Sequence, residues 1–243
     1  MGVDFQKDVL IGRTITYDDL HAMGFKGIFV GSGAGFPRFM NIPGENLNGV
    51  MSSNEYLTRI NLMQAGRGGD TPVITGDTVA VVGGGNTAMD STRTALRMGA
   101  RLEEIGHAKE EGVELMTLHN PVEYIGDEKG RVRAMKVQRM ELGEPDASGR
   151  RSPIPVEGAI EEIPVDVVIV AVGVSPNSLV PRSIDGLEVS RRGTIVVNDE
   201  SMQSNISDLY AGGDIVRGGA TVILAMGDGR KAAQNMAKTL LEK

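Results

Sequence analysis

Residues 79–90 read VAVVGGGNTAMD, and this stretch decides the fold. It begins with a short apolar run, Val79–Val82, which is typical of a buried parallel strand. Three glycines follow, and the spacing of the next residues predicts a helix over Asn86–Met98, which Gly99 is suited to end. The residues that recur on one face of this helix are Ala88, Met89, Thr92, Ala95 and Leu96. The pattern is therefore a strand, a glycine turn and a helix.

Gly83, Gly85 and Ala88 match the spacing G-x-G-x-x-[G/A] of a Rossmann-type site for a dinucleotide. The first glycine permits a tight turn, the second leaves room for a pyrophosphate beside the backbone, and the small alanine lets the helix approach the strand. The N–H groups of Asn86 and Thr87 lie at the positive end of the helix dipole, where they can bind phosphate. Either of these two side chains is also a candidate cap for the helix.

A glycine turn without a ligand is the alternative, and the flanking strand and helix favour the ligand. A further glycine of the expected site, Gly173, closes a strand predicted over Val165–Val172. The expected dinucleotide-binding residues are Gly83, Gly84, Gly85, Asn86, Thr87, Ala88, Asp90 and Gly173. A second glycine cluster at 31–35 imitates the motif, but the Phe36-Pro37 pair after it disfavours a helix. We therefore interpret this cluster as a loop at the end of a strand over Gly27–Val30.

Composition limits the classes of function that the chain can have. Its 243 residues can bury a large core, and 25 Lys+Arg against 32 Asp+Glu give a net charge of −7, which argues against a nucleic-acid or anionic-membrane surface. The absence of cysteine excludes disulfides, Cys-ligated zinc and Cys-ligated iron–sulfur clusters within this chain. No apolar run approaches the ~20 residues of a membrane span, and no signal peptide opens the chain. We expect a cytoplasmic α/β protein, without nucleic-acid or membrane partners.

The sequence offers no constellation for hydrolysis or metal binding. Its three histidines, His21, His107 and His119, lie far apart, and no G-x-S-x-G pattern surrounds a serine. We therefore expect no metal ligand and no catalytic side chain. A nicotinamide cofactor carries hydride chemistry itself, and the protein supplies position and electrostatics.

An antiparallel region follows the Rossmann-type motif. Short alternating strands over about 122–163, with GEPDASGR as a hairpin connection, predict a β flap. Its prolines, Pro153, Pro155 and Pro164, favour an edge strand because proline has no N–H to donate.

The remaining elements are predicted around this flap. A strand is expected over Val113–Leu118 and a charged helix over Leu102–Glu111, whereas the last helix starts at about Thr221. The loop Gln64–Gly76 is the best linker, and a second crossing between domains is expected near Gly173–Pro181.

One strand of the Rossmann pattern is missing from the sequence. The strand after the first helix normally ends in the ribose-binding residue, which is acidic for NAD, whereas an arginine accommodates the 2′-phosphate of NADP. Here Gly99-Ala100 leads directly into Arg101-Leu102-Glu103-Glu104, which is helix-like. Glu103 lies ~20 residues after the first glycine, but on the wrong kind of element. A solvated helix face is therefore favoured for it.

Four stretches together resemble a known family. They are PGENLNGVMSSNEYLTRINLM, VVGGGNTAMDSTRTALRMGA, MELGEPDASGRRSPIPVEG and YAGGDIVRGGATVILAMGDGRKAA. Over essentially its whole length the chain is similar to the small (beta) subunit of NADPH-dependent glutamate synthase, and to the NADPH-binding subunit of ferredoxin:NADP oxidoreductases. The resemblance implies NADP(H) and FAD as cofactors, with the NADPH domain inserted into the FAD domain. Hydride would pass to the flavin, and electrons through iron–sulfur clusters to the glutamate synthase large subunit or another electron-accepting subunit.

The sequence departs from the family in two places. The family begins with a cysteine-bearing iron–sulfur domain and a first FAD-binding glycine motif, neither of which is in this chain. The iron–sulfur clusters would therefore belong only to that N-terminal region. Between Ala100 and Arg101 the family has a further strand that ends in two arginines for the 2′-phosphate of NADP. A Cα–Cα distance far from 3.8 Å between these two residues would show that the numbering closes over a gap.

The resemblance also assigns residues to FAD. Gly213 and Asp214 match the second flavin motif, in which the carboxylate accepts a hydrogen bond from the ribityl chain. The start of the last helix faces the flavin, and a glycine loop lies beside its nucleotide. The remaining residues assigned in this way are Ala220, Thr221, Val222, Gly31, Ser32 and Gly33. A carboxylate that only stabilises a turn is the alternative for Asp214. Because the first flavin glycine motif is absent, we expect the isolated chain not to retain FAD.

These inferences give an α/β fold: a three-layer Rossmann-like NAD(P)-binding domain, with a parallel sheet and an antiparallel β flap, inserted in a partial FAD-binding domain. The expected segments are 1–72 and 176–243 for the FAD-binding domain and 73–175 for the NAD(P)-binding domain. We expect a fragment of an NADPH-dependent flavin oxidoreductase that is inactive on its own. The alternatives are a ferredoxin oxidoreductase subunit and a non-catalytic nucleotide-binding module. A methyltransferase is disfavoured, because the flap and the YAGGD stretch have no role there.

Overall fold

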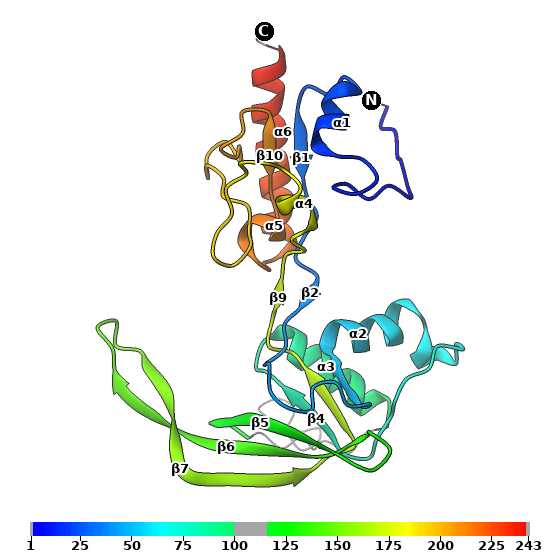
Figure 1. Ribbon diagram of the computed structural model, residues 1–243, viewed down its shortest axis with the longest axis vertical. Coiled ribbons are helices and arrows are strands. Elements are labelled where there is room, and N and C mark those ends of the chain that lie inside the picture. Colours follow the sequence, from blue (N-terminus) through cyan, green and yellow to red (C-terminus); the bar gives the residue numbers. More distant parts are fainter. Residues whose placement is uncertain (1, 100–115, 242–243) are drawn as a thin grey trace. The chain divides into compact units, whose positions relative to one another are not determined.

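The computed structural model describes residues 2–99 and 116–241. The chain divides into two compact units (Figure 1). The split unit consists of Met1–Phe36 and Val174–Lys243, and the inserted unit consists of Pro37–Gly173. One unit is thus inserted into the chain of the other.

The first crossing between the units lies well before the linker Gln64–Gly76 that the sequence suggested, and before the expected boundary at residue 72. The reason is a strand that the sequence analysis did not identify, β3 at Val50–Ser52, which pairs with β8 (Val167–Val170) inside the inserted unit. The second crossing lies at Gly173, at the start of the range expected for it.

A parallel sheet with the strand order β3-β8-β4 forms the middle of the inserted unit. β4 spans Val79–Val82, the bounds predicted from the sequence, and it pairs in register with β8, with Val79 opposite Val167. All four side chains of β8 are buried. A central parallel strand is covered on both faces, which explains its continuous apolar run.

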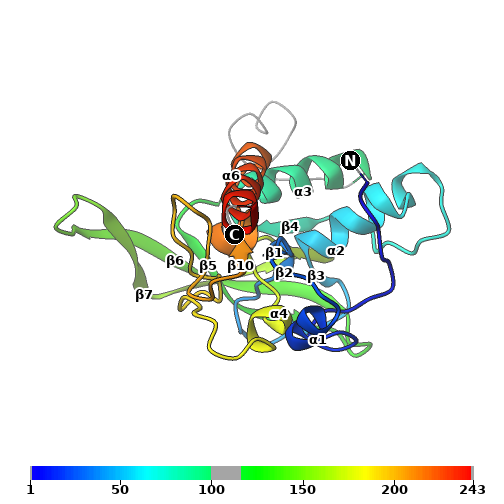
Figure 2. The same cartoon turned by 90° about the horizontal axis from the view of Figure 1, so that it is seen from above.

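The side chains of β8 alternate between two cores. Val167 and Ile169 pack with Tyr56 and Ala95 on the helical side of the sheet, whereas Val168 and Val170 pack against the antiparallel strands. The helical side holds α2 (Ser53–Leu57), η1 (Thr58–Leu62), η2 (Ala65–Arg67) and α3 (Asn86–Arg97). Figures 1 and 2 show α2 and α3 beside the parallel sheet. This arrangement confirms the three-layer α/β fold.

The third layer is the antiparallel sheet β5-β6-β7. Its strands are β5 (His119–Gly126), β6 (Val132–Pro145) and β7 (Arg151–Pro164). The three prolines for which an edge strand was predicted, Pro153, Pro155 and Pro164, lie in β7 at the edge of the sheet. The strand expected over Val113–Leu118 is wrong for its last residues, because Leu118 has a φ of 59° in a turn and β5 begins only after it. Residues 113–115 and the helix expected at 102–111 lie outside the described residues.

The split unit is built on the parallel pair β1-β10. β1 spans Ile28–Val30 and β10 spans Leu209–Ala211, so the ends of both strands meet at one edge. The long helix α6 (Val222–Leu241) covers this pair. The remaining helices of the unit are α1 (Tyr17–Ala22), α4 (Leu179–Arg182) and α5 (Asp214–Arg217). Two short strands, β2 (Phe36–Pro37) and β9 (Val174–Ser175), pair with each other.

Candidate functional site

The glycine turn begins where β4 ends, beside the end of β8. Gly83 has a φ of 136°, and a Cβ atom at this position would collide with the carbonyl oxygen of Ala171. The amide of Ala171 in turn donates to the carbonyl of Val82 at 2.8 Å. Only glycine fits a backbone with a positive φ and so close a neighbour. Gly83 is therefore required by the fold itself.

Gly84 and Gly85 stand in a different environment. A Cβ atom at either position would meet no atom within 4 Å. Packing within the protein thus does not explain why these two residues lack a side chain. Open space beside the turn fits the sequence-based hypothesis that a phosphate group approaches the backbone there.

The start of α3 offers three unused donors. Its first internal hydrogen bond joins the amide of Met89 to the carbonyl of Gly85 at 3.1 Å, so the N–H groups of Asn86, Thr87 and Ala88 find no acceptor among the described residues. Such groups and the helix dipole together favour an anion. Ala88 is fully buried and lets the helix lie close to the sheet.

The helix cap differs from the prediction. Gly85 is the N-cap residue of α3, with no side-chain hydrogen bond, so neither Asn86 nor Thr87 caps the helix. Both residues already lie inside the helix, and a capping side chain must come from the residue that precedes it. Because Asn86 and Thr87 are exposed, their amides remain accessible to a ligand.

Gly173 lies at the same edge of the sheet as the glycine turn, since it follows β8 by three residues. Its φ is 103°, and its carbonyl accepts the amide of Arg38 at 3.0 Å. Asp90 lies one turn into α3 and is exposed. All the residues that the sequence assigned to the dinucleotide thus lie in the inserted unit, with Gly83–Ala88 and Gly173 at one edge of its parallel sheet.

A second helix begins at this edge, and the sequence analysis missed it. Ser52 ends β3 and caps α2, since its Oγ accepts the amide of Glu55 at 3.1 Å. The signal was a serine three residues before a glutamate, the spacing that starts a helix.

The residues assigned to FAD lie in the split unit, where two strands end together. Val30 pairs with Ala211, so Gly31 and the glycines at 212–213 follow neighbouring strand ends. Beyond them, the side chain of Asp214 accepts the amide of Ala220 at 2.9 Å through Oδ1. This contact closes the turn between β10 and α6, so the carboxylate takes the turn-stabilising role considered as the alternative. Its other oxygen, Oδ2, has no hydrogen bond among the described residues.

The first turn of α6 resembles that of α3 in its free donors. Thr221 caps the helix, because its Oγ1 accepts the amide of Leu224 at 3.4 Å. The amides of Val222 and Ile223 have no acceptor within the described part of the chain. Their side chains are 75% and 80% exposed, which is unusual for residues of this type. A planar, partly apolar ligand with an anionic character fits such a surface.

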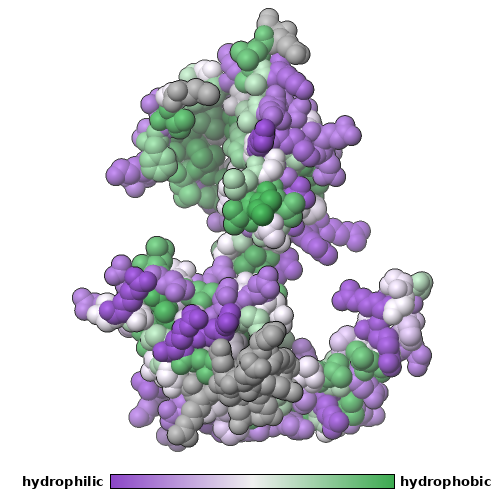
Figure 3. Space-filling view, turned by 180° about the vertical axis from the view of Figure 1, so that it is seen from behind, coloured by the Kyte–Doolittle hydropathy of each residue, from purple (hydrophilic) through white to green (hydrophobic). Residues whose placement is uncertain are grey.

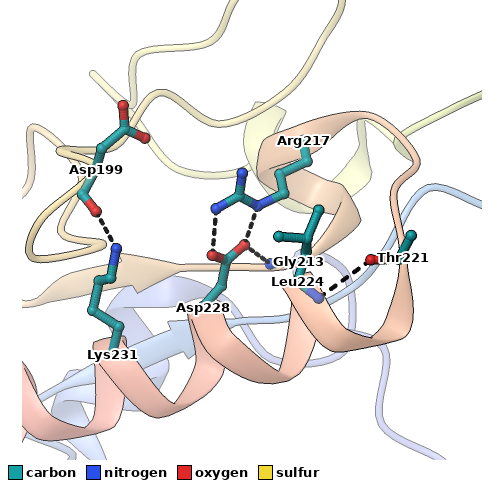
Figure 4. A network of polar contacts seen from close by, with 7 residues as sticks. All are labelled: Asp199, Gly213, Arg217, Thr221, Leu224, Asp228 and Lys231. Carbon is teal, nitrogen blue, oxygen red and sulfur yellow. Dashed lines mark hydrogen bonds and ion pairs between the residues drawn. The ribbon is translucent and has the colours of Figure 1, made fainter.

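A buried carboxylate that the sequence analysis missed lies beneath this turn (Figure 4). Asp228 of α6 is 2% exposed and accepts hydrogen bonds from Arg217 Nε and Nη2, both at 2.6 Å, and from the amide of Gly213 at 3.1 Å. The hydrogen bond from Arg217 holds the pKa of Asp228 below its usual value. The carboxylate therefore stays ionised and joins three segments.

No metal centre is formed by the described residues. His21 pairs with Asp208 at 2.9 Å, and His119 contacts the carbonyl of Thr117 at 2.8 Å, so both have local partners. No group of three possible ligands gathers in residues 2–99 and 116–241. His107, the stretch Arg101–Glu104 and the suspected gap after Ala100 lie outside the described residues.

The fold defines a protein of the class that carries two Rossmann-like units in one chain, one inserted in the other. Residues 1–229 match the family model described as pyridine nucleotide-disulphide oxidoreductase. The chain therefore belongs to this family.

Curated relatives span the whole chain. It is 33% identical over 263 residues to the glutamate synthase [NADPH] small chain of Escherichia coli, and the aligned region covers 99% of this chain and 56% of that protein. It is 35% identical over 259 residues to the beta subunit of an NADP(+)-dependent formate dehydrogenase from Moorella thermoacetica, and the aligned region covers 99% of this chain and 35% of that protein. The chain thus spans only part of the length of these relatives.

Solved structures share the fold. FprA of Mycobacterium tuberculosis, solved in complex with NADPH, superimposes with a TM-score of 0.72 at 19% identity, over 97% of this chain and 68% of that one. A thioredoxin reductase from T. acidophilum superimposes with a TM-score of 0.60. Among the described residues, no helix is long and apolar enough to cross a membrane.

Proposed function

We propose that the inserted unit binds NADPH and that the chain belongs to an oxidoreductase that passes its hydride to FAD. The turn Gly83–Ala88 carries the proposal, because it joins open space beside two glycines to the exposed amides of Asn86 and Thr87, which find no acceptor in the described part of the chain. The pyrophosphate would lie against the amides of Asn86 and Thr87, and Gly85 would leave the room for it. NADPH supplies the hydride when it is bound, and these residues hold it in position.

The split unit would contribute the FAD that accepts the hydride from NADPH. Asp214 and the first turn of α6 fit one side of FAD, because Oδ2 of the carboxylate and the amides of Val222 and Ile223 remain available to a ligand. The helix dipole would stabilise negative charge on the reduced flavin. We propose this unit as part of a flavin domain, completed by sequence outside this chain, and the chain alone should not retain FAD.

The partner is proposed from the relatives. Their names describe a small chain of glutamate synthase and a beta subunit of formate dehydrogenase, both of which use NADPH or NADP(+). We propose a glutamate synthase type of protein with a large subunit as the electron acceptor, reached through iron–sulfur clusters outside this chain. A ferredoxin-reducing subunit is the competing assignment. Reconstituting the complete protein with glutamate synthase large subunit or with ferredoxin would decide between them.

A single methyl group tests the nucleotide site. Gly85→Ala should preserve stability, since its Cβ meets no atom within 4 Å and its φ of −88° suits alanine. The methyl group should nevertheless weaken NADPH binding at least tenfold, because it occupies the space proposed for the pyrophosphate. Calorimetric titration of this chain with NADPH measures the effect, and the midpoint of urea unfolding checks stability.

Gly227→Ala is the matched control, because this glycine of α6 also has open space around it and lies in the other unit. It should leave the affinity for NADPH unchanged. Equal affinity of Gly85→Ala and the unchanged chain would contradict the proposed site. Titration with NADH gives a second result: a preference for NADPH above about tenfold, or ~1.4 kcal/mol, would show that arginines for the 2′-phosphate are present.

A further inference from the structure

The turn between β10 and α6 is held by a relay of polar contacts. Asp228, in the second turn of α6, accepts the amide of Gly213 at 3.1 Å, and the next residue, Asp214, accepts the amide of Ala220 at 2.9 Å. Ala220 directly precedes the cap of α6, Thr221. A shift of the buried carboxylate would therefore be transmitted to both ends of the turn.

Arg217 joins the relay from α5. Its guanidinium forms a two-pronged ion pair with Asp228, with 2.6 Å for each of the two contacts (Figure 4). Arginine is suited to this role because its planar fork matches the two oxygens of a carboxylate. One carboxylate thus fixes α5, Gly213 and α6 relative to each other.

Close packing leaves little freedom around the carboxylate. A Cβ atom at Gly212 would lie 2.8 Å from Cβ of Asp228 and 3.3 Å from Cζ of Phe29. The helix α6 can approach β10 this closely only because residue 212 is glycine. Asp228 therefore cannot swing away to another partner while α6 is docked.

We infer that Arg217 and Asp228 are positioning residues, which fix the Gly213–Asp214 turn and the first turn of α6 as one surface for FAD. The inference rests on the proposed function for its ligand. Neither residue needs to touch the cofactor, because Arg217 acts through Asp228, and Asp228 acts through the amide of Gly213. Loss of the pair should loosen the turn while the apolar contacts of α6 with β10 remain.

Lys231 provides a matched control on the same helix. Its Nζ donates to the carbonyl of Asp199 at 2.6 Å, and it lies farther along α6 from the turn than Asp228 does (Figure 4). Lys231→Met removes another polar tether of α6 and leaves the contacts of Asp228 with Arg217 and Gly213 in place. A general role of such tethers in holding α6 would make it resemble Asp228→Asn.

The first experiment uses this chain without any cofactor. Hydrogen exchange should become at least tenfold faster at the amides of Gly213 and Ala220 in Asp228→Asn and in Arg217→Gln, while amides in the middle of α6 keep their protection. Lys231→Met should change neither amide. Unchanged exchange at both amides in Asp228→Asn would overturn the inference, and so would an equal effect of Lys231→Met.

The second experiment uses the complete protein with its whole flavin domain. Asp228→Asn and Arg217→Gln should each weaken FAD binding at least tenfold, as measured by flavin fluorescence, and the double variant should be no weaker than the poorer single variant. Binding within threefold of the unchanged protein would overturn the inference. If the unchanged protein binds no FAD, the proposed function fails instead, and the exchange experiment still decides whether the pair fixes the turn.

Discussion

The two units of the chain differ in how completely they cover their own apolar surface. In the inserted unit, helices and an antiparallel sheet cover both faces of the parallel sheet, and β8 is buried throughout. In the split unit, β1 pairs only with β10 among the described residues. Within residues 2–99 and 116–241, fifteen of the twenty-four exposed large apolar residues lie in the split unit, which is the smaller one. Figure 3 shows these apolar patches on the visible face of that unit.

This difference separates the two proposed nucleotide sites. The glycine turn of the inserted unit is built entirely on a covered sheet, and each of its features follows from nearby residues. The side of the split unit proposed for the flavin instead presents an apolar helix start, with Met226 69% exposed one turn after Val222. Matched substitutions in the two units should therefore have different consequences, and they test the comparison directly.

The largest difference is expected for glycine to alanine. Gly83→Ala forces a Cβ against the carbonyl of Ala171 at a positive φ, which should cost about 4 kcal/mol of unfolding free energy. Gly227→Ala, in the open part of α6, should instead stabilise by about 0.5 kcal/mol. The chain has no tryptophan, so urea unfolding should be followed by circular dichroism. A loss of unfolding free energy below about 1 kcal/mol in Gly83→Ala would show that the backbone of the turn can adjust to the added methyl group.

An isoleucine pair gives the next effect. Ile169 in β8 is fully buried, and Ile169→Ala should cost about 3 kcal/mol through lost contacts and a cavity. Ile223 in α6 is 80% exposed, and Ile223→Ala should change stability by less than about 0.5 kcal/mol. The same urea titration measures both. A loss of unfolding free energy above about 2 kcal/mol in Ile223→Ala would show that Ile223 is buried in solution.

The sequence predicted the features that depend on neighbouring residues. Strand, turn and helix at 79–98 follow from a local apolar run and from glycines, and the structure has them at Val79–Val82 and Asn86–Arg97. The edge position of β7 follows from its prolines for the same reason. A residue that cannot donate an N–H is restricted wherever it occurs.

Features that depend on distant residues were not predictable. β3 has three residues and ends in Ser52, so it shows no periodicity, and only its pairing with β8 makes it a strand. Because of that pairing, the first crossing between the units lies at Phe36–Pro37, earlier than the sequence suggested. Asp228 stands between glycines in a helical stretch and is expected to be solvated, whereas its partner lies 11 residues earlier in α5. Tertiary packing, which the local pattern does not contain, decides such positions.

The smallest predicted effect distinguishes two tyrosines, one in each unit. Tyr17 of the split unit donates to Oδ1 of Asp208 at 2.7 Å, so Tyr17→Phe should cost about 1 kcal/mol at pH 7. Tyr56 of the inserted unit is 3% exposed, and its hydroxyl has no hydrogen bond among the described residues. Tyr56→Phe should therefore be nearly neutral at pH 7.

At alkaline pH, Tyr56→Phe should stabilise the chain instead of being nearly neutral. Burial raises the pKa of Tyr56 to about 12, above the value of about 10 in an unfolded chain. Between these pH values the unfolded state loses the proton and the folded state keeps it, so the stability falls as the pH rises. Tyr56→Phe removes this loss, which should make it more stable than the unchanged chain by on the order of 2 kcal/mol near pH 12. Urea midpoints at pH 7 and pH 11 measure the crossover, and parallel pH profiles would show that Tyr56 ionises equally in both states.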